Sequence, residues 1–135
     1  MKITLESDYA IRIVMRLAQQ EKRMDAGTLS QETGVPQRFA LKILRKLVNA
    51  DLLRSFKGIS GGYQLNHPAH EISLADIIEV IEGPFAFSRC LTQDDCCSHP
   101  DGGCSKAECK VQQVFGDISL LVHQKLKATT VDTLL

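Results

Sequence analysis

The stretch between Asp25 and Ala50 constrains the fold most, because its pattern predicts two short helices joined by a tight turn. Asp25 is a suitable N-cap for a helix over residues 26–33, and Gly34 is a suitable C-terminal stop. Pro36 stands where a second helix can begin, and that helix is expected to end near Ala50. Two short helices joined by a turn that contains glycine form the pattern of a helix-turn-helix.

The second of these helices, from about Gln37 to Ala50, has one apolar face and one basic face. Arg38, Lys42 and Arg45 stand at i, i+4 and i+7 and therefore share a face. The opposite face is expected to be buried and consists of Ala40, Ile43, Leu44, Leu47 and Val48. A generic three-helix core would bury that apolar face too, but it would not need three aligned basic residues opposite. The pattern therefore favours a helix that reads DNA.

A β-hairpin is expected directly after this helix. Its strands cover roughly 53–57 and 62–66, and Gly58-Ile59-Ser60-Gly61 supplies the turn. A hairpin in this position is the wing of a winged helix, from which Arg54 and Lys57 can reach phosphates or a minor groove. The alternative is an ordinary hairpin packed on the core.

Charge is distributed unevenly, although the 135 residues have a net charge of zero. Residues 36–66 hold six basic side chains against Asp51 alone, a net charge of +5, and residues 71–109 hold two basic against eight acidic ones, a net charge of −6. The basic block indicates a polyanionic partner such as DNA. The chain has no nucleophile–base pair or phosphate-binding loop at a recognisable spacing, so neither an enzyme nor a small-molecule substrate is expected.

All five cysteines fall within one segment, and they are Cys90, Cys96, Cys97, Cys104 and Cys109. The segment is rich in glycine and acidic residues and could not bury thiols in a core. Thiols spread along such a loop can converge on one point, and clustered cysteines often bind metal. Four thiolates suffice for a [2Fe–2S] or [4Fe–4S] cluster and equally for tetrahedral zinc.

Three further helices complete the predicted fold. An amphipathic helix over 5–20 precedes the helix-turn-helix, and a helix over 73–82 begins at the Ser-x-x-Asp start signal of Ser73. The last helix, from about Ser105 to Ala128, carries an apolar stripe that needs a partner, which a second copy of the chain would supply. The stripe consists of Val111, Val114, Phe115, Ile118, Leu121, Val122 and Leu126.

These elements predict a mainly α fold with a small β-hairpin wing, in which a winged helix-turn-helix is followed by a long dimerisation helix. The DNA-binding domain is expected over 1–83, a cysteine-rich loop over 84–104, and the dimerisation helix with its tail over 105–135. No stretch is apolar and long enough to span a membrane, and the charged N-terminus lacks the cleavage site of a signal peptide. A cytoplasmic protein is therefore expected, in which structural disulfides are rare.

Several segments resemble the Rrf-two (BadM/Rrf) family of bacterial winged-helix regulators, over nearly the whole chain. They are SDYAIR near the start, the helix-turn-helix, the wing motif GISGGYQL and the cysteine loop before a long helix. The resemblance implies a homodimer that binds palindromic DNA and holds an iron–sulfur cluster near the dimerisation helix. It favours such a cluster, [2Fe–2S] ahead of [4Fe–4S], over zinc. The cysteine loop is similar to those of the IscR-like iron–sulfur regulators and the NsrR-like nitric-oxide sensors.

The loop departs from the spacing that the family commonly shows, which is three cysteines separated by five residues each. Cys90 and Cys96 keep that gap, but the other three do not continue it. The segment KVQQVFGDI after Cys109 resembles the family's segment after its last cysteine, which makes Cys109 the final ligand. Gln112 replaces the histidine of IscR-like members, and Asp8 matches the position of a carboxylate ligand in NsrR-like members.

Two ligand sets remain open. One consists of four thiolates, with Cys96 as the alternate for Cys97: Cys90, Cys97, Cys104 and Cys109. The other combines three thiolates with Asp8 of a second subunit, and a hard carboxylate ligand would make the cluster easy to lose or attack. His99 ranks last, because lone loop histidines are usually solvated.

The predicted roles follow from this assignment. Gln37 and Arg38 at the helix start are expected to touch base edges, while Lys42, Arg45 and Lys57 hold phosphates. The first hypothesis is a regulator that senses iron–sulfur status and controls cluster assembly or iron and sulfur metabolism. The alternatives are a nitric-oxide-sensing repressor, and a thiol-redox or zinc protein that binds a protein partner.

Overall fold

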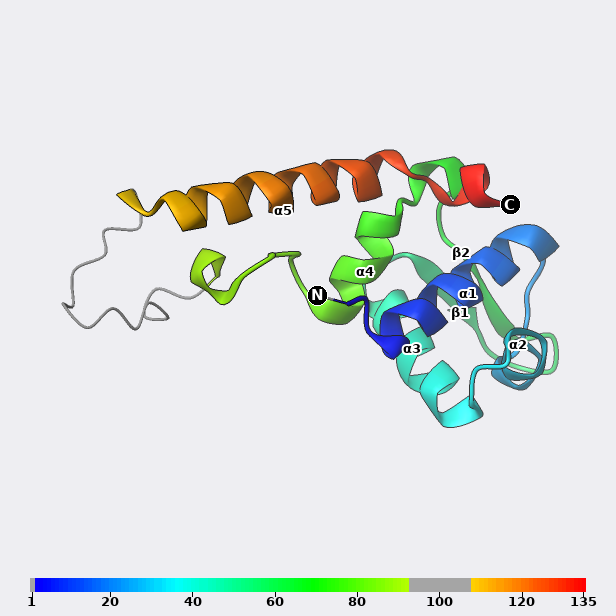
Figure 1. The fold of residues 1–135 in the computed structure, drawn as a ribbon. Helices are drawn as coiled ribbons and strands as arrows, with labels where there is room; N and C mark the ends of the chain where they lie inside the picture. Colours follow the sequence, from blue (N-terminus) through cyan, green and yellow to red (C-terminus); the bar gives the residue numbers. More distant parts are fainter. Residues whose placement is uncertain (1, 93–107) are drawn as a thin grey trace.

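The computed structural model describes residues 2–92 and 108–135. Over these residues the architecture is mainly helical with one small hairpin, and this confirms the predicted fold class (Figure 1). The elements are α1 (Leu5–Gln20), α2 (Ala26–Thr33), α3 (Gln37–Asn49), β1 (Leu53–Phe56), β2 (Gly62–Leu65), α4 (Leu74–Glu82) and α5 (Lys110–Ala128). Short 3₁₀-helices add η1 (Ala69–Glu71), η2 (Arg89–Leu91) and η4 (Val131–Leu134).

Polar capping and a left-handed glycine define α2 at the places that the sequence predicts. Asp25 accepts hydrogen bonds from the backbone N–H and the hydroxyl of Thr28, at 2.8 and 2.9 Å. These bonds hold the pKa of the Asp25 carboxyl below its ordinary value. Gly34 ends α2 with a φ of 73°, a conformation that favours glycine. The turn that follows positions α3, which ends at Asn49, one residue earlier than predicted.

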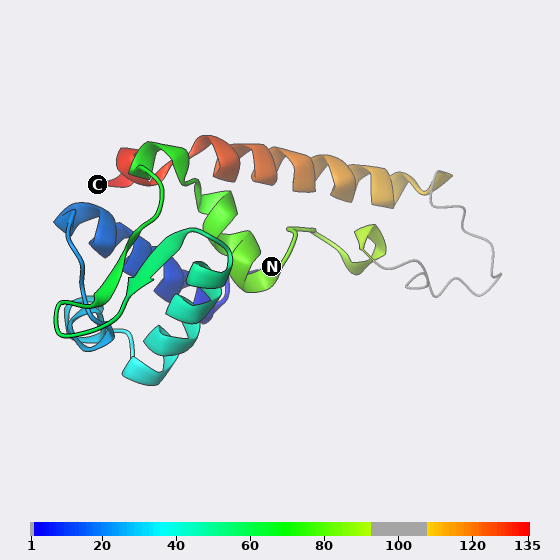
Figure 2. The ribbon, with the colours of Figure 1, turned by 180° about the vertical axis from the view of Figure 1, so that it is seen from behind.

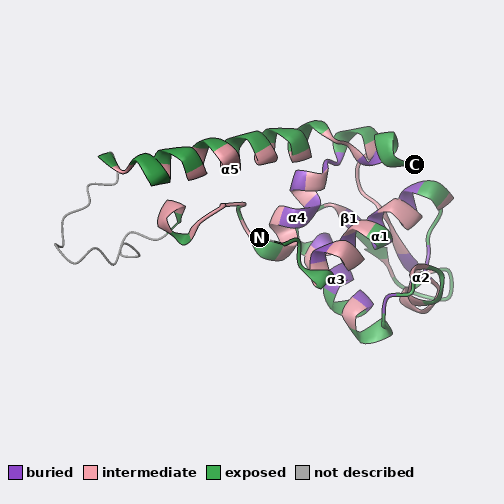
Figure 3. Cartoon of the chain, viewed as in Figure 1, coloured by how far each residue is buried: buried purple, intermediate pink, exposed green. Residues whose placement is uncertain are grey.

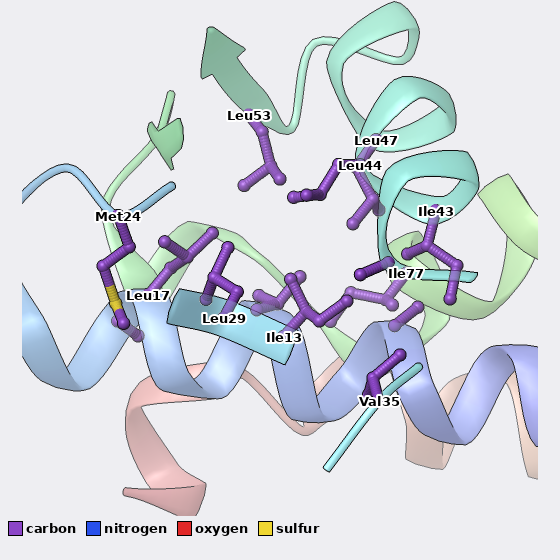
Figure 4. Close-up of a cluster of buried hydrophobic side chains, with 14 of the residues drawn as sticks. Ile13, Leu17, Met24, Leu29, Val35, Ile43, Leu44, Leu47, Leu53 and Ile77 are labelled. Atoms are coloured by element: carbon purple, nitrogen blue, oxygen red, sulfur yellow. The ribbon is translucent and has the colours of Figure 1, made fainter. Parts of the chain in front are cut away.

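An aliphatic core forms where α1, α3 and α4 meet, with contributions from the connecting segments (Figure 4). On α3 the predicted inward face is confirmed, except that Val48 is only half-buried; its buried residues are Ala40, Ile43, Leu44 and Leu47. Leu29 of α2, Leu53 of β1 and Val131 of η4 are also buried. Burial of a side chain of this size contributes about 1.5–3 kcal/mol. The core therefore fixes which face of α3 remains accessible.

The hairpin is a two-stranded sheet, and a single bridge links it to the connection before α2. β1 and β2 pair antiparallel, with Phe56 opposite Gly62. Met24 bridges Tyr63 through two backbone hydrogen bonds of 3.0 and 2.8 Å. Gly62 has a φ of 145°, and a Cβ there would lie 2.7 Å from the Met24 carbonyl oxygen, so this close approach requires glycine. A single bridging residue leaves no alternating pattern, which is why the sequence does not predict it.

The last helix contacts α4 through its C-terminal part and the segment of residues 87–91 through its N-terminal half. Lys127 and His123 of α5 pair with Asp76 and Glu79 of α4. The N-terminal part of α5 projects beyond the other elements (Figures 1 and 2). None of the helix is buried, and most of it is exposed (Figure 3).

The predicted start of this helix near Ser105 is too early. α5 begins at Lys110 with Cys109 as its N-cap residue, and residues 105–107 lie outside the described residues. The predicted start of the preceding helix is close: α4 begins at Leu74, and Ser73 caps it through a capping box with Asp76. Within the described chain, no helix combines the length and apolarity needed to cross a membrane.

Candidate functional site

The four residues of α3 that were predicted to face DNA are all exposed, and they are Gln37, Arg38, Lys42 and Arg45. They lie opposite the buried face of the helix, so the core positions them together. The guanidinium carbon of Arg38 lies 5.2 Å from the centroid of the neighbouring Phe39 ring. Among the described residues, neither Arg38 nor Arg45 has a carboxylate partner. Both guanidinium groups are therefore available to an external anion.

Lys42 differs from these arginines because it already forms an ion pair. Glu6 of α1 accepts hydrogen bonds from the Nζ atoms of Lys42 at 3.2 Å and Lys46 at 2.7 Å. The hydrogen bond from Lys46 holds the pKa of Glu6 below its ordinary value, so this carboxylate is ionised at neutral pH. A phosphate that binds Lys42 must compete with Glu6. The sequence gives no signal for this pair, because its members are 36 positions apart.

A shallow groove of about 220 Å³ separates α3 from the wing. It is lined by Leu41, Arg45, Val48, Asn49, Ser55 and Tyr63. Arg45 of α3 thus points toward the hairpin across this groove, where its side chain is accessible to an external anion. Because side chains alternate along a strand, Arg54 and Phe56 lie on the hairpin face turned away from α3.

The predicted cations Arg54 and Lys57 are exposed on the wing, and a third cation that was not predicted, Arg23, lies beside them. Arg23, in the connection between α1 and α2, places its guanidinium carbon 3.5 Å from the centroid of the Phe56 ring. It lies outside the basic block of residues 36–66, and only the bridge at Met24 brings it to the hairpin.

Two of the five cysteines fall within the described residues. Cys90 lies in η2 and carries a free, half-buried thiol whose Sγ is 3.4 Å from the hydroxyl of Ser88. Cys109 is the residue directly before α5. The N-terminal end of a helix carries a partial positive charge, which favours an anionic group such as a thiolate there. The remaining candidates lie outside the described residues, and they are Cys96, Cys97, Cys104 and His99.

Gln112 links the Cys90 segment to the last helix. Its Nε2 donates a 2.9 Å hydrogen bond to the Cys90 carbonyl oxygen, so η2 is held against the first turn of α5. In the sequence, Gln112 is notable only because it replaces the histidine of IscR-like members. Nothing there indicates that its amide reaches back 22 residues.

The side chains that could hold a metal ion or a cluster are only partly described. Over residues 2–92 and 108–135, no group of three or more His, Cys, Asp or Glu side chains could hold a metal ion. The two described thiols are both partly buried, and Gln112 links the segment of one of them to the last helix. Iron–sulfur clusters use thiolate ligands, so these two thiols are of the right chemical type, and the other three cysteines lie outside the described residues.

Asp8 lies on α1 and is about half exposed, with a side-chain exposure of 47%. Its carboxylate forms an ion pair of 2.7 Å with Arg12, one turn further along the helix. The carboxylate is therefore accessible but already has a cationic partner.

Comparison with known proteins identifies relatives along the whole chain. A family model described as Rrf2, iron-dependent transcriptional regulator, matches residues 3–135. A putative HTH-type transcriptional regulator rrf2-like of Rhodobacter capsulatus is 31% identical over 127 residues, which cover 86% of this chain and 80% of that protein. The HTH-type transcriptional regulator IscR of Vibrio campbellii is 25% identical over 137 residues, which cover 100% of this chain and 77% of that protein.

Other matches differ in how much of the relative they span. Protein aau3 of Rhizobium meliloti is 36% identical over 92 residues, and the match covers 67% of this chain but only 60% of that protein. The structure of CymR (YrzC), the global cysteine regulator of B. subtilis, has a TM-score of 0.77 at 24% identity and covers 99% of this chain and 95% of that one. The structure of T. potens IscR has a TM-score of 0.75 at 20% identity and covers 98% and 84%.

The structural likenesses show the same fold, and the Rhodobacter and Vibrio relatives are named as HTH-type transcriptional regulators and not as enzymes. The family model and the Rhodobacter relative both extend over most of the chain, including the winged helix-turn-helix. The chain therefore belongs to the Rrf2 family of transcription regulators.

Proposed function

We propose that this regulator senses iron–sulfur cluster status through a cluster held by its loop cysteines and controls genes of cluster assembly or of iron and sulfur metabolism in the cytoplasm. The observation that carries the proposal is the hydrogen bond from Gln112 to Cys90, which links the Cys90 segment to α5. The IscR relative, which aligns with the full chain, supports the same assignment.

The proposed ligands are thiolates, with Cys96 as the alternate for Cys97: Cys90, Cys97, Cys104 and Cys109. A bound cluster, [2Fe–2S] ahead of [4Fe–4S], would supply a redox-sensitive cross-link among these thiolates. Gln112 would position the Cys90 segment both with and without a bound cluster, because its hydrogen bond is to the backbone carbonyl oxygen and not to the thiol. Zinc is the alternative occupant of four thiolates.

Direct contacts connect α5 with α3 through α4 and α1. α5 is paired with α4 through Lys127 and His123. The carboxylate of Glu82, at the end of α4, accepts hydrogen bonds from the first turn of α1, including 2.7 Å from the Thr4 hydroxyl. Glu6 in that same turn holds Lys42 and Lys46 of α3. A displacement of α5 is therefore passed to α3 through groups that touch one another.

A homodimer provides the partner that α5 needs. Val111, Val114 and Leu121 of the predicted stripe are 59%, 54% and 65% exposed in the single chain. An apolar row of this kind on a projecting helix is covered when a second helix packs against it. The dimer would place two copies of α3 in successive major grooves of a palindromic operator, about 34–36 Å apart.

The six residues predicted to bind DNA have distinct proposed roles. Gln37 and Arg38, at the N-terminal end of α3, contact base edges. Arg45 in the groove, Lys42 beside Glu6, and the wing residues Arg54 and Lys57 hold phosphates.

Arg38→Ala tests the reading role of α3. We expect operator binding to weaken by about 1–3 kcal/mol, with relaxed preference at one base position, because a bidentate contact to guanine is lost. Fluorescence anisotropy on duplexes selected by the wild-type protein from a random library measures both effects. Lys22→Ala, an equal loss of charge at an exposed residue outside α3, is the matched control. Equal binding by the two variants contradicts the assignment of Arg38.

Nitric-oxide sensing is the second candidate, and the accessibility of Asp8 favours it. The Asp8 carboxylate is about half exposed, and an exposed ion pair such as that with Arg12 contributes only about 0–1 kcal/mol. Replacement of Arg12 by an iron ion as the partner of Asp8 would therefore cost little stability. Such a carboxylate-bound iron would be easier for a small molecule to attack than one held by four thiolates.

A further inference from the structure

We propose that Arg23 is an additional DNA-binding residue, which holds a backbone phosphate beside the wing while its guanidinium group is stacked on Phe56. The proposal rests on the proposed DNA binding by α3 and the wing. It adds a segment outside the helix-turn-helix and the hairpin, namely the connection between α1 and α2, to the DNA-binding surface.

The sheet brings this connection to the wing. Met24 and Tyr63 exchange two backbone hydrogen bonds, so the connection is held beside β2 at this one antiparallel bridge. Figure 2 shows the hairpin with the connection from α1 to α2 near it. The close approach depends on Gly62, where a side chain would collide with the Met24 backbone. Arg23, one position before Met24, is thus fixed relative to the hairpin by backbone contacts.

Side-chain alternation places Arg23 on the outward face of the hairpin. The bridging residue Met24 is buried, so Arg23 next to it points to the opposite face, which also carries Arg54 and Phe56. Gly62, which pairs with Phe56 in the register, has no side chain that would separate Arg23 from the ring. The guanidinium carbons of Arg23 and Arg54 lie 3.5 and 5.8 Å from the Phe56 ring centroid.

The contact with Phe56 leaves Arg23 able to bind an anion. Stacking uses the flat face of a guanidinium group, while its N–H donors point outward in the plane and match a phosphate. Arg23 is exposed and has no carboxylate partner among the described residues. The nearby carboxylate of Asp25 is already hydrogen-bonded to Thr28.

The geometry points to a second DNA strand as the source of that phosphate. The inward side of the hairpin faces the groove that holds Arg45, and the outward side presents Arg23 and Arg54. A minor groove is flanked by two backbones, so a hairpin that enters it can meet one backbone with each face. Arg23 and Arg54 would then hold the backbone farther from α3.

Arg23→Ala tests the proposal on the full-length protein, with a fluorescein-labelled duplex of random sequence and a series of salt concentrations. Loss of one phosphate contact is expected to lower the slope of log K against log salt by about 0.9. Lys22→Ala removes the same charge one residue earlier and is expected to change the slope by less than half as much. Circular dichroism and the thermal midpoint establish that both variants are folded.

The possible outcomes separate the two levels of the proposal. If wild-type protein binds with a steep salt dependence and Arg23→Ala matches Lys22→Ala, the role of Arg23 is wrong and the DNA-binding function stands. If wild-type protein shows no salt-dependent binding, both fail. Phe56→Leu, which keeps every charge, is expected to weaken binding more in the wild-type background than in the Arg23→Ala background, where only the longer contact with Arg54 remains. An equal effect in both backgrounds would overturn the stacking role of Phe56.

Discussion

Cys109→Ala is expected to lower the iron and sulfide content of anaerobically purified protein by about tenfold or more, with loss of the brown colour that the proposed cluster would give. Loss of a thiolate leaves a cluster iron without its ligand, and changes even to groups around a metal ligand cost about 10–100-fold in affinity. Cys109 is also the cysteine nearest the start of α5, so no other described thiol can replace it without moving the helix.

Lys110→Ala is the matched control for this variant, since it changes the adjacent exposed residue at the first position of α5. It is expected to retain iron at the wild-type level. Iron, sulfide and the visible spectrum are measured on both proteins from parallel anaerobic preparations. Retention of iron and colour by Cys109→Ala would show that the assigned ligand set is incorrect.

Leu121→Glu is expected to convert the proposed dimer into a monomer and to weaken operator binding by about two orders of magnitude or more. The side chain is 65% exposed in the single chain, so the substitution leaves the fold of one subunit intact. A carboxylate buried in an apolar interface costs several kcal/mol, and each 1.4 kcal/mol corresponds to about tenfold in affinity.

Sedimentation equilibrium and anisotropy on the selected operator measure these two effects. Gln124→Glu introduces the same charge at an exposed position off the apolar stripe, and we expect it to remain dimeric. A Leu121→Glu variant that is still dimeric would place the subunit interface elsewhere on the molecule.

Local signals explain why so much of the winged helix is predictable from the sequence. Asp25, Gly34 and Ser73 act on backbone groups within a few residues of themselves, and each ends or begins a helix where the sequence indicates. The apolar spacing on α3 likewise determines its buried face, and therefore the exposed position of Arg38 and Arg45.

The features that the sequence does not reveal all depend on contacts between distant segments. Glu6 meets Lys42 only after α1 and α3 pack together, and Arg23 reaches the wing only through the bridge at Met24. Gln112 is an unremarkable polar residue until α5 and η2 are side by side. The predicted start of α5 near Ser105 is too early although residues 105–108 have the Ser-x-x-Glu pattern of a helix start, because α5 begins only at Lys110.

The most direct test of cluster-controlled DNA binding is the operator affinity of one anaerobic preparation before and after its iron is removed by a chelator. Iron, sulfide and zinc are analysed in the same two samples. We predict that the first sample contains iron and sulfide with little zinc, and that its affinity differs from that of the second by about five- to 150-fold, the usual range of coupling between two sites. Zinc in place of iron, or the same affinity in both samples, would contradict the proposed function.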